Sequence, residues 1–363
     1  MKRRSVLKLI GLSGLAALGA GGAWSMFRKP VNAYYSGPVS DHFNGLRFVA
    51  PGRQSRPDKS SLDMLKWQFG GGKDTLPKEA WPAQFPSPFQ DKPPQRVSNG
   101  LRVVLVGHAS YLIQTANLNI LIDPVWSERA SPVRFAGPRR ANPPGIAFDD
   151  LPPIDAVLVT HNHYDHMDVP TLARIMARWT PRLITPLGND TILRNADPSL
   201  DSAIARDWGD SIDLSNTVRV TLEPSLHWSA RWTSDRFMAL WCNFVIETPA
   251  GKIYACGDTG YDPDSIFPKM QQKYGGFRLA LLPIGAYEPR WFMKEQHMNP
   301  QEAVQVFHEL GADNAIGHHW GTFKLTDEGV ERPREALTLA LAAAGIDPAR
   351  FRAFQPGQVW EGG

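Results

Sequence analysis

A chain of 363 residues can bury a large hydrophobic core, either in two domains or in one large α/β sandwich. Its formal net charge is only +3, and its basic residues are spread out, which argues against nucleic acid as a partner. The two cysteines, Cys242 and Cys256, are too few for a disulfide framework or a cysteine-ligated metal site.

Residues 1–29 have the pattern of a targeting sequence. A basic start leads into an uncharged apolar run from Leu9 to Phe27. The segment Arg3 to Lys8, RRSVLK, resembles a twin-arginine export signal. The apolar run is also just long enough to span a bilayer. We therefore expect an export signal or a retained N-terminal anchor. The body of the protein would be periplasmic, or anchored to the inner membrane and facing the periplasm.

Residues 30–99 are rich in proline and glycine and carry scattered aromatic residues. Prolines such as Pro82, Pro86 and Pro88 argue against long regular elements. We expect an irregular arm whose aromatic side chains pack on the core. An aromatic edge that faces lipid is the alternative.

Beyond residue 100, the hydrophobic pattern alternates between strands and helices, as in an α/β domain. Helices are predicted over residues 169–179, 299–310 and 334–344, and one more before residue 213. The second begins with an N-cap signature, Asn299-Pro300-Gln301-Glu302. Strands are predicted over residues 102–108, 111–115, 118–124, 154–160, 183–187, 218–224, 237–248, 252–258, 279–285 and 314–319.

The strands that contain the two cysteines form a predicted hairpin around Thr248 to Gly251. In this hairpin Cys242 lies nearly opposite Gly257, so the two cysteines occupy neighbouring positions on opposite faces. We expect two free, buried thiols that point apart.

The motif HNHYDHMD, residues 161–168, directly follows a buried, β-branched strand. His161 and His163 stand two residues apart in an extended segment, so both can bind one cation from the same side. Asp165 and His166 come where the chain bends and can face a second cation. Imidazole suits zinc, and a carboxylate can bind or bridge. A solvated histidine-rich loop is the alternative, but the density of ligand residues favours a two-metal site.

Further polar residues stand at predicted strand ends far away in the sequence. His227 would complete a three-histidine site with the first two histidines of the motif. Asp258 could bridge both ions with one carboxylate, and either His318 or His319 could supply another ligand.

Two more strand-end residues, His108 and Asp123, leave two interpretations open. Each could orient a metal-binding imidazole from behind, or each could simply cap a turn. The proline-containing stretch 129–150 is long enough to wall a pocket.

The motif HNHYDHMD resembles the HxHxDH signature of the metallo-β-lactamase superfamily. Within it, the chain from Val103 to Leu325 resembles N-acylphosphatidylethanolamine-hydrolysing phospholipases D, through LPPIDAVLVTHNHYDHMD, PSLHWSAR, GDTGYDP, PIGAYEPRWFMKEQHMNPQEAV and HHWGTF. The signature is specific for metal, and PIGAYEPRWFMKEQH is specific for this branch. The resemblance implies an α/β fold, the four-layer αββα sandwich, with the metals at one edge of the two sheets of a catalytic domain, residues 100–363.

The resemblance also implies two zinc ions per chain and their ligands. One ion takes three histidines, the other takes one aspartate and two histidines, and Asp258 bridges. His319 is preferred to His318 because it directly precedes the residues WGTF. The implied metal ligands are His161, His163, Asp165, His166, His227, Asp258 and His319.

The residues implied to act in catalysis are Asp165, Asp258 and His297. His297 matches a pocket histidine that contacts the leaving-group oxygen or the phosphate; a helix-capping loop residue is the alternative. Neighbouring residues are expected to line the same pocket, namely Gln296, Tyr287 and Trp291.

The activity implied is that of a zinc-dependent phosphodiesterase of the phospholipase D type. It would hydrolyse N-acyl-phosphatidylethanolamine or related phospholipids through a hydroxide that bridges the metals, with a membrane surface as a further partner. The chain lacks the H-x-K motif of histidine-dependent phospholipases D. A lactonase or other acyl hydrolase, and a non-enzymatic metal- or lipid-binding protein, are the alternatives. The sequence indicates no oligomeric state.

Overall fold

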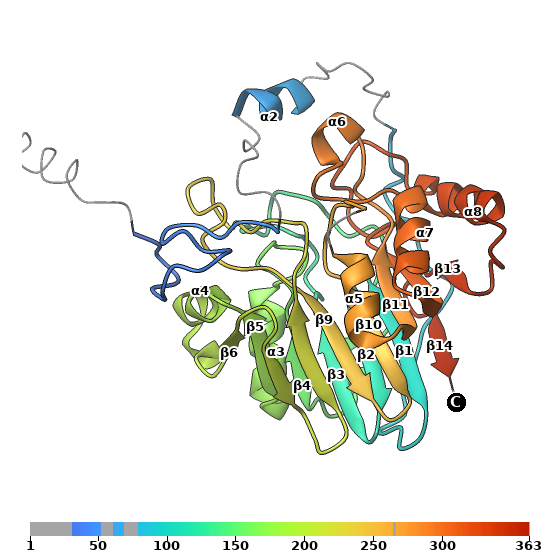
Figure 1. Cartoon of the computed structure of the whole chain (residues 1–363), viewed down its shortest axis with the longest axis horizontal. Helices are drawn as coiled ribbons and strands as arrows, with labels where there is room; N and C mark the ends of the chain where they lie inside the picture. Colours follow the sequence, from blue (N-terminus) through green and yellow to red (C-terminus); the bar gives the residue numbers. More distant parts are fainter. Residues whose placement is uncertain (1–30, 52–60, 69–78, 264–265, 363) are drawn as a thin grey trace, which may run out of the picture.

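The computed structural model describes residues 31–51, 61–68, 79–263 and 266–362. Within these ranges two seven-stranded sheets pack face to face (Figure 1). The first sheet, in spatial order, consists of β14 (Val359–Gly362), β1 (Leu101–Gly107), β2 (Ser110–Thr115), β3 (Leu118–Ile122), β4 (Ala156–Leu158), β5 (Arg182–Pro186) and β6 (Ile204–Arg206). The second consists of β13 (Phe351–Ala353), β12 (Ala312–His318), β11 (Phe277–Pro283), β10 (Gly251–Ala255), β9 (Asn243–Thr248), β8 (Arg219–Glu223) and β7 (Ser211–Asp213).

Helices cover the outer face of each sheet (Figure 1). The first sheet carries α3 (Val169–Trp179) and α4 (Asn189–Ala196). The second carries α5 (Phe267–Tyr274), α7 (Pro300–Glu309) and α8 (Arg332–Ala344). The remaining helical elements are α2 (Ser61–Gln68), α6 (Arg290–Met293) and the 3₁₀ turns Phe148–Asp150 and Pro198–Leu200.

Three hydrophobic clusters fill the spaces between these layers. One lies between the two sheets and includes Val103, Phe244 and Ile316. The second joins the first sheet to α3 and α4, and the third joins the second sheet to α5, α7 and α8. Strands such as β1 are buried on both faces, which explains their continuous apolar sequence. This is the predicted α/β fold, the four-layer αββα sandwich.

Strand direction brings the ends of distant strands together. In the first sheet β1, β3 and β4 run the same way, because β2 is antiparallel to both β1 and β3, and β3 is parallel to β4. In the second sheet β8, β10, β11 and β12 share one direction. The carboxyl ends in each set therefore lie at one edge of its sheet.

Local signals predicted several elements correctly. Helix α3 covers residues 169–179, as its apolar period predicts. At α7 the predicted cap is present, because Asn299 Oδ1 accepts from the N–H of Glu302 and the Glu302 carboxylate accepts from the N–H of Asn299, both at 2.9 Å. The two cysteines are free and buried, and they belong to different clusters on opposite faces of the second sheet, as predicted.

The strand predicted over residues 237–248 is wrong in its first half, because β9 begins only at Asn243. The N–H groups of Leu240 and Cys242 donate to carbonyls of Leu187 and Thr160, beyond β5 and β4 of the other sheet. The strand predicted over residues 154–160 is also shorter than predicted, because β4 covers only Ala156–Leu158. The sequence analysis also missed α5 and α6 and four short strands, β6, β7, β13 and β14, none longer than four residues.

Described parts of the arm, residues 31–51, 61–68 and 79–99, contact the sandwich. Phe43 and Phe48 are buried with their rings 4.7 Å apart, and Trp81 Nε1 donates to the carbonyl of Glu328 at 2.9 Å. In its described parts the arm has no regular element longer than a single β-bridge other than α2. The boundaries of the three predicted segments, residues 1–29, 30–99 and 100–363, stay predictions.

The predicted export signal or anchor, residues 1–29, lies outside the described residues. Among those that are described, no helix has both the length and the apolar character needed to cross a membrane.

Several ionisable side chains join the arm to the sandwich, and His42 is one of them. His42 Nε2 lies 2.8 Å from an Asp207 carboxylate oxygen, and Nδ1 lies 2.6 Å from that of Asp41. Burial alone would lower the pKa of His42, but the hydrogen bonds to Asp207 and Asp41 outweigh burial and raise it. A pKa raised on folding stabilises the fold below the ordinary value, and this stabilisation is lost as the pH rises through the raised value.

Replacing His42 with alanine should therefore destabilise the fold more in weak acid than in weak base. We expect the loss in free energy of unfolding to be about 1 kcal/mol larger at about pH 6 than at about pH 9. Urea unfolding of both proteins at the two pH values measures this difference. Asp41→Asn is the control with a smaller effect, because Asp41 is 91 % exposed. An equal loss at both pH values would contradict the prediction.

Candidate metal centre

The seven predicted ligands gather where the two sheets meet at their carboxyl edges. In the second sheet, strands β8, β10 and β12 end shortly before His227, Asp258 and His319 respectively. The motif from His161 to His166 follows β4 of the other sheet. Of the seven, only His163 is half-buried and the rest are buried. Both sheets therefore contribute to one enclosed cluster.

The first group of ligand atoms belongs to three histidines. His161 Nε2 lies 2.9 Å from His163 Nδ1, and His227 Nε2 lies 3.2 Å from the same atom. Tetrahedral zinc with Zn–N distances of about 2.0–2.1 Å would separate its nitrogens by about 3.3 Å. The three nitrogens thus have the spacing of ligands around one ion.

Hydrogen bonds behind the rings decide which nitrogens carry protons. The Thr160 hydroxyl donates to Asp123, so it accepts from His161 Nδ1 at 2.9 Å. His227 Nδ1 donates to the carbonyl of Gln296 at 2.9 Å. The Nε2 atoms of His161 and His227 then each carry a lone pair that points toward His163 Nδ1. That nitrogen carries at most one proton, so it can donate to only one of them. A bound cation satisfies all three nitrogens, so the donors fit a metal ion.

The second group has two histidines and a carboxylate. His166 Nε2 and His319 Nε2 lie 3.3 Å apart, and each lies within 3.5 Å of Asp165 Oδ2. This mixed nitrogen and oxygen set suits a second divalent ion.

Asp258 stands between the two groups. Its Oδ1 lies 3.4 Å from His166 Nε2 and 3.0 Å from His319 Nε2, whereas its Oδ2 lies 3.6 Å from His227 Nε2 and 3.9 Å from His161 Nε2. Each oxygen faces a different group. This arrangement is that of a carboxylate able to bridge two ions.

His108 and Asp123 contact the ligands from behind. His108 Nε2 lies 2.9 Å from Asp165 Oδ2, and Asp123 Oδ2 accepts from His166 Nδ1 at 2.7 Å. Asp123 also accepts from the backbone and side chain of Thr160, which holds His161. Of the two interpretations open for this pair, the contacts favour orientation of ligands over the capping of turns.

Three of these residues hold an unusual backbone conformation. His108, Asp123 and His319 have φ angles of 56°, 41° and 65°, in the left-handed region that costs side-chain-bearing residues free energy. All three follow strands directly. The surrounding hydrogen bonds and packing hold this strain at the cluster.

Burial controls protonation in the first group. It lowers the pKa of His163 to about 4 and the pKa of His161 and His227 well below the ordinary value, with smaller effects from neighbouring charges. These imidazoles are therefore neutral at pH 7 and can offer lone pairs.

In the second group nearby carboxylates outweigh burial. Burial opposes a charge on His319, but Asp258 and Asp165 raise its pKa to about 9, and they raise the pKa of His166 well above its ordinary value. Positive charge is thus favoured at this position. A metal ion that binds there would displace these protons.

His297 also reaches the cluster. Its Nδ1 lies 3.8 Å from Asp258 Oδ2, and burial lowers its pKa to about 4, so the ring is neutral at pH 7. His318, by contrast, belongs to neither ligand group; its ring packs 5.4 Å from that of Tyr111.

A cavity of about 260 Å³ opens onto these groups. The residues that line it include four with ionisable side chains, His163, Asp165, Asp258 and His297. Apolar side chains line much of the rest of the wall, among them Met64, Trp67, Phe292, Met293 and Leu325. We call this cavity the metal pocket.

The expectations for the pocket wall are met only in part. Gln296 lines it, and Ala130 of the stretch 129–150 does so too. Tyr287 and Trp291 do not. The N–H of Tyr287 bonds to Glu328, and on α6 it is the next residue, Phe292, that faces the cavity.

The sequence analysis missed the other wall residues. Trp228 had a signal, because it directly follows a ligand, and its ring lies 4.4 Å from that of His163. Met64 and Trp67 had none, since they lie in the arm. They reach the pocket only because Trp67 stacks on Phe292 and its Nε1 donates to Asp327.

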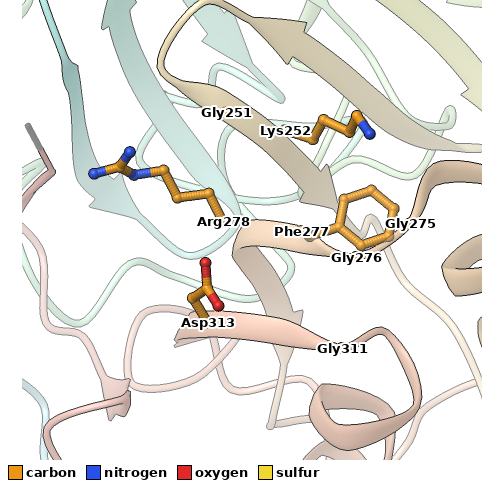
Figure 2. A pocket seen from close by; sticks show the side chains of 8 residues that line it. All are labelled: Gly251, Lys252, Gly275, Gly276, Phe277, Arg278, Gly311 and Asp313. Atoms are coloured by element: carbon orange, nitrogen blue, oxygen red, sulfur yellow. The ribbon is translucent and has the colours of Figure 1, made fainter.

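A larger but shallow pocket of about 380 Å³ lies beside the turn between β9 and β10, at the opposite strand ends (Figure 2). Glycines form much of it. Lys252 donates to the carbonyl of Tyr274 and Arg278 donates to that of Ala250, so backbone groups already engage both cations. It offers none of the chemistry of the metal pocket.

Comparison with known proteins places this centre in a family. The profile of the beta-lactamase superfamily domain matches residues 118–320. N-acyl-phosphatidylethanolamine-hydrolyzing phospholipase D 1 of Caenorhabditis elegans is 37% identical over 273 residues, which is 72% of this chain and 76% of that protein. A UPF0173 metal-dependent hydrolase of Caldivirga maquilingensis is 27% identical over 254 residues, 70% of this chain and 95% of that protein.

Among solved structures, the isothiocyanate hydrolase from Delia radicum gut bacteria aligns with a TM-score of 0.56. It is 19% identical, and the alignment covers 71% of this chain and 98% of that one. At that identity the likeness concerns the fold alone. The family profile and the sequence relatives carry the assignment: the chain belongs to the metallo-β-lactamase superfamily and, within it, to the family of the N-acyl-phosphatidylethanolamine-hydrolysing phospholipases D.

Proposed function

We propose that this chain is a two-zinc phosphodiesterase that hydrolyses N-acyl-phosphatidylethanolamine or a related phospholipid in the manner of a phospholipase D. One observation carries the proposal: two groups of convergent ligand atoms share the carboxylate of Asp258, which lines a pocket together with several apolar side chains. Two adjacent divalent ions suit phosphodiester cleavage, and an apolar wall suits an acylated substrate.

His161, His163 and His227 would hold one zinc ion, and Asp165, His166 and His319 would hold the other, with Asp258 bridging. When bound, the two ions would activate water and neutralise the charge that builds on the phosphate oxygens. The positions of the ligand side chains would determine where the ions, and therefore the activated water, lie in the pocket.

Supporting hydrogen bonds restrain four of the ligands, His161, Asp165, His166 and His227. Asp123 orients His166 directly and His161 through Thr160, so one buried carboxylate supports both groups. His108 restrains the Asp165 oxygen that faces the second group. Such supporting residues prepare the ligands before substrate arrives.

His297 is positioned to contact the substrate. Its ring lies on the pocket wall, 5.1 Å from the ring of His227, and is neutral at pH 7. A neutral imidazole can donate one hydrogen bond to a phosphate oxygen or to the leaving-group oxygen.

Substrate charge and apolar character match the rest of the pocket. An N-acylated phosphatidylethanolamine is an anion, and Arg236, whose guanidinium stacks 4.2 Å from the Trp228 ring, lines the pocket. The wall of Met64, Trp67, Phe292 and Met293 can contact an acyl chain. A cysteine nucleophile is not part of the proposal, because both thiols are buried and burial raises their pKa well above the ordinary value.

The proposal is tested by incubating the purified chain, with its zinc content measured, with N-acyl-phosphatidylethanolamine, phosphatidylcholine and a lactone. We expect release of phosphatidic acid and N-acylethanolamine. Turnover of the lactone alone would contradict the proposal and identify the chain as an acyl hydrolase of the superfamily. Lipid binding without any turnover would identify a binding protein.

Substitution of ligands tests the metal centre. His319→Ala should lower the zinc content from about two ions to about one per chain, and Asp258→Asn should lower turnover at least about 1,000-fold, because each removes a group the ions need. Elemental analysis and the lipid assay measure the two effects.

The matched control for His319 is its neighbour. His318→Gln should keep about two zinc ions per chain, because His318 faces Tyr111 rather than the cluster. Loss of zinc from the His318 variant alone would reverse the assignment of these two histidines.

His297→Ala should lower kcat by about 100-fold while the zinc content stays unchanged, because the lost contact is to substrate rather than to metal. His308→Ala, an exposed histidine on α7, is the control. A fall in zinc content that accounts for the lost turnover would show that His297 instead supports the metal centre.

A further inference from the structure

The main chain, rather than a side-chain hydrogen bond, places the ring of His297 on the pocket wall. Its Nδ1 has no hydrogen-bond partner among the described residues. The Asp258 Oδ2 atom, 3.8 Å from Nδ1, is too far away for a hydrogen bond. The position of the ring therefore depends on what fixes the backbone at residue 297.

Hydrogen bonds fix that stretch of backbone on both sides. The N–H groups of Gln296 and His297 both donate to the carbonyl of Met293 at 2.9 Å, which closes the turn after α6. The His297 carbonyl accepts from a side chain, because Arg290 Nη1 donates to it at 2.9 Å. Arg290 thus joins the first residue of α6 to the residue that faces the metal pocket.

The guanidinium of Arg290 is itself anchored on α7. Its Nη2 donates to both carboxylate oxygens of Glu302, each at 2.8 Å, and the two side chains are only 24 % and 18 % exposed. Glu302 Oε2 also accepts from the N–H of Asn299 in the cap of α7, and α7 packs on the second sheet. A planar guanidinium makes directional, charge-assisted hydrogen bonds. The position of α7 is therefore passed on to the carbonyl of His297.

The start of the same segment is fixed by a buried carboxylate. Glu328 is 7 % exposed, and its two oxygens accept from the N–H groups of Tyr287 and Glu288 at 3.2 Å and 3.1 Å. The N–H of Arg290 in turn donates to the Glu288 carboxylate at 2.9 Å. Arg290 therefore holds the end of the segment from a start that is already restrained.

Arg290 has no direct place in the chemistry of the pocket. It is absent from the described residues that line the metal pocket, whereas Phe292, Met293 and His297 of the same segment are among them. Its Nη1 and Nη2 are engaged by the His297 carbonyl and by Glu302. Any effect of Arg290 on a reaction would therefore pass through the residue that it holds.

We propose that Arg290 is a positioning residue that, anchored by Glu302, holds the backbone of His297 so that the ring faces the metal pocket. The inference rests on the proposed function for the reaction that His297 serves. The neighbouring carbonyl, that of Gln296, accepts from the ligand His227, so an effect on the metal centre is the alternative that the test must separate.

Arg290→Gln removes the charge and the forked donor while it keeps a polar side chain. We expect kcat for phospholipid hydrolysis to fall about tenfold, with KM changed less than about threefold and the zinc content unchanged, because His297 is displaced rather than removed. Steady-state kinetics and elemental analysis of the same samples measure these values. A loss of zinc that accounts for the lower kcat would overturn the proposal, because Arg290 would then act on the metal centre.

The effect must also depend on His297. In a His297→Ala chain, Arg290→Gln should lower kcat less than about twofold, because the ring that Arg290 positions is already gone. An equal fall in kcat with and without the ring would overturn the proposal. Glu302→Gln keeps an acceptor for the cap of α7 and removes the charge that anchors Arg290. This variant should lower kcat in the same direction, by about threefold.

The matched control is Arg102→Gln. Arg102 is a buried arginine near the start of β1, away from the carboxyl edge, and its guanidinium donates to Asp91 at 2.6 Å and to Gln114 at 3.1 Å. Its loss should lower the Tm at least as much as the loss of Arg290, whereas kcat should stay within about twofold of the parent value. A tenfold fall in kcat in this variant would assign the effect to lost stability and overturn the proposal.

Hydrogen exchange reports on the positioning without any substrate. The N–H groups of Gln296 and His297 are protected by their bonds to Met293. Arg290→Gln should therefore speed exchange over residues 294–298 of the zinc-loaded chain at least about tenfold, and Arg102→Gln should not. Mass spectrometry of the digested protein measures both rates.

The exchange experiment separates this inference from the proposed function. Unchanged exchange over residues 294–298 in Arg290→Gln would overturn the positioning of His297, even in a chain that hydrolyses phospholipid. Faster exchange in a chain that hydrolyses no phospholipid would refute the proposed function alone.

Discussion

The carboxylate of Asp258 is a buried negative charge, and a buried charge is unstable unless opposite charge or hydrogen bonds compensate for it. Imidazoles from both sheets surround it, with His319 Nε2 at 3.0 Å and His166 Nε2 at 3.4 Å from its Oδ1. Burial raises the pKa of Asp258, but these two positive neighbours outweigh burial and hold the pKa well below the ordinary value. The cluster therefore favours positive charge at its centre, and bound metal ions would supply that charge.

The ligands that meet at this edge of the sandwich come from both of its sheets. Ligands from β4 belong to the first sheet, and those from β8, β10 and β12 belong to the second. Asp123 fixes a ligand of each group, and its own backbone is held at a φ of 41°. Because each group takes ligands from both sheets, packing between the sheets determines the distances between the ligands within each group. A change in that packing would disturb both, even where no ligand is altered.

The sequence predicted the parts of this centre that depend on local pattern. HNHYDHMD, the cap at Asn299 and the apolar period of α3 are each encoded within a few residues, and the structure has them as predicted. What the sequence could not predict depends on contacts between distant segments. Residues 237–242 look like a strand but bond to the other sheet, and Trp67 becomes part of the pocket only by stacking on Phe292. Hydrophobic period alone carries no information about either partner.

The fold alone does not determine the substrate. A structure of the same fold is that of an isothiocyanate hydrolase, and at 19% identity the likeness between the two chains concerns the fold alone. The residues that can distinguish a lipid from a small electrophile lie on the pocket wall, and two of them come from α2. This helix turns Met64 and Trp67 toward the pocket and leaves Leu62 and Leu65 exposed. One eight-residue helix thus contributes both to the wall of the metal pocket and to the exposed surface beside it.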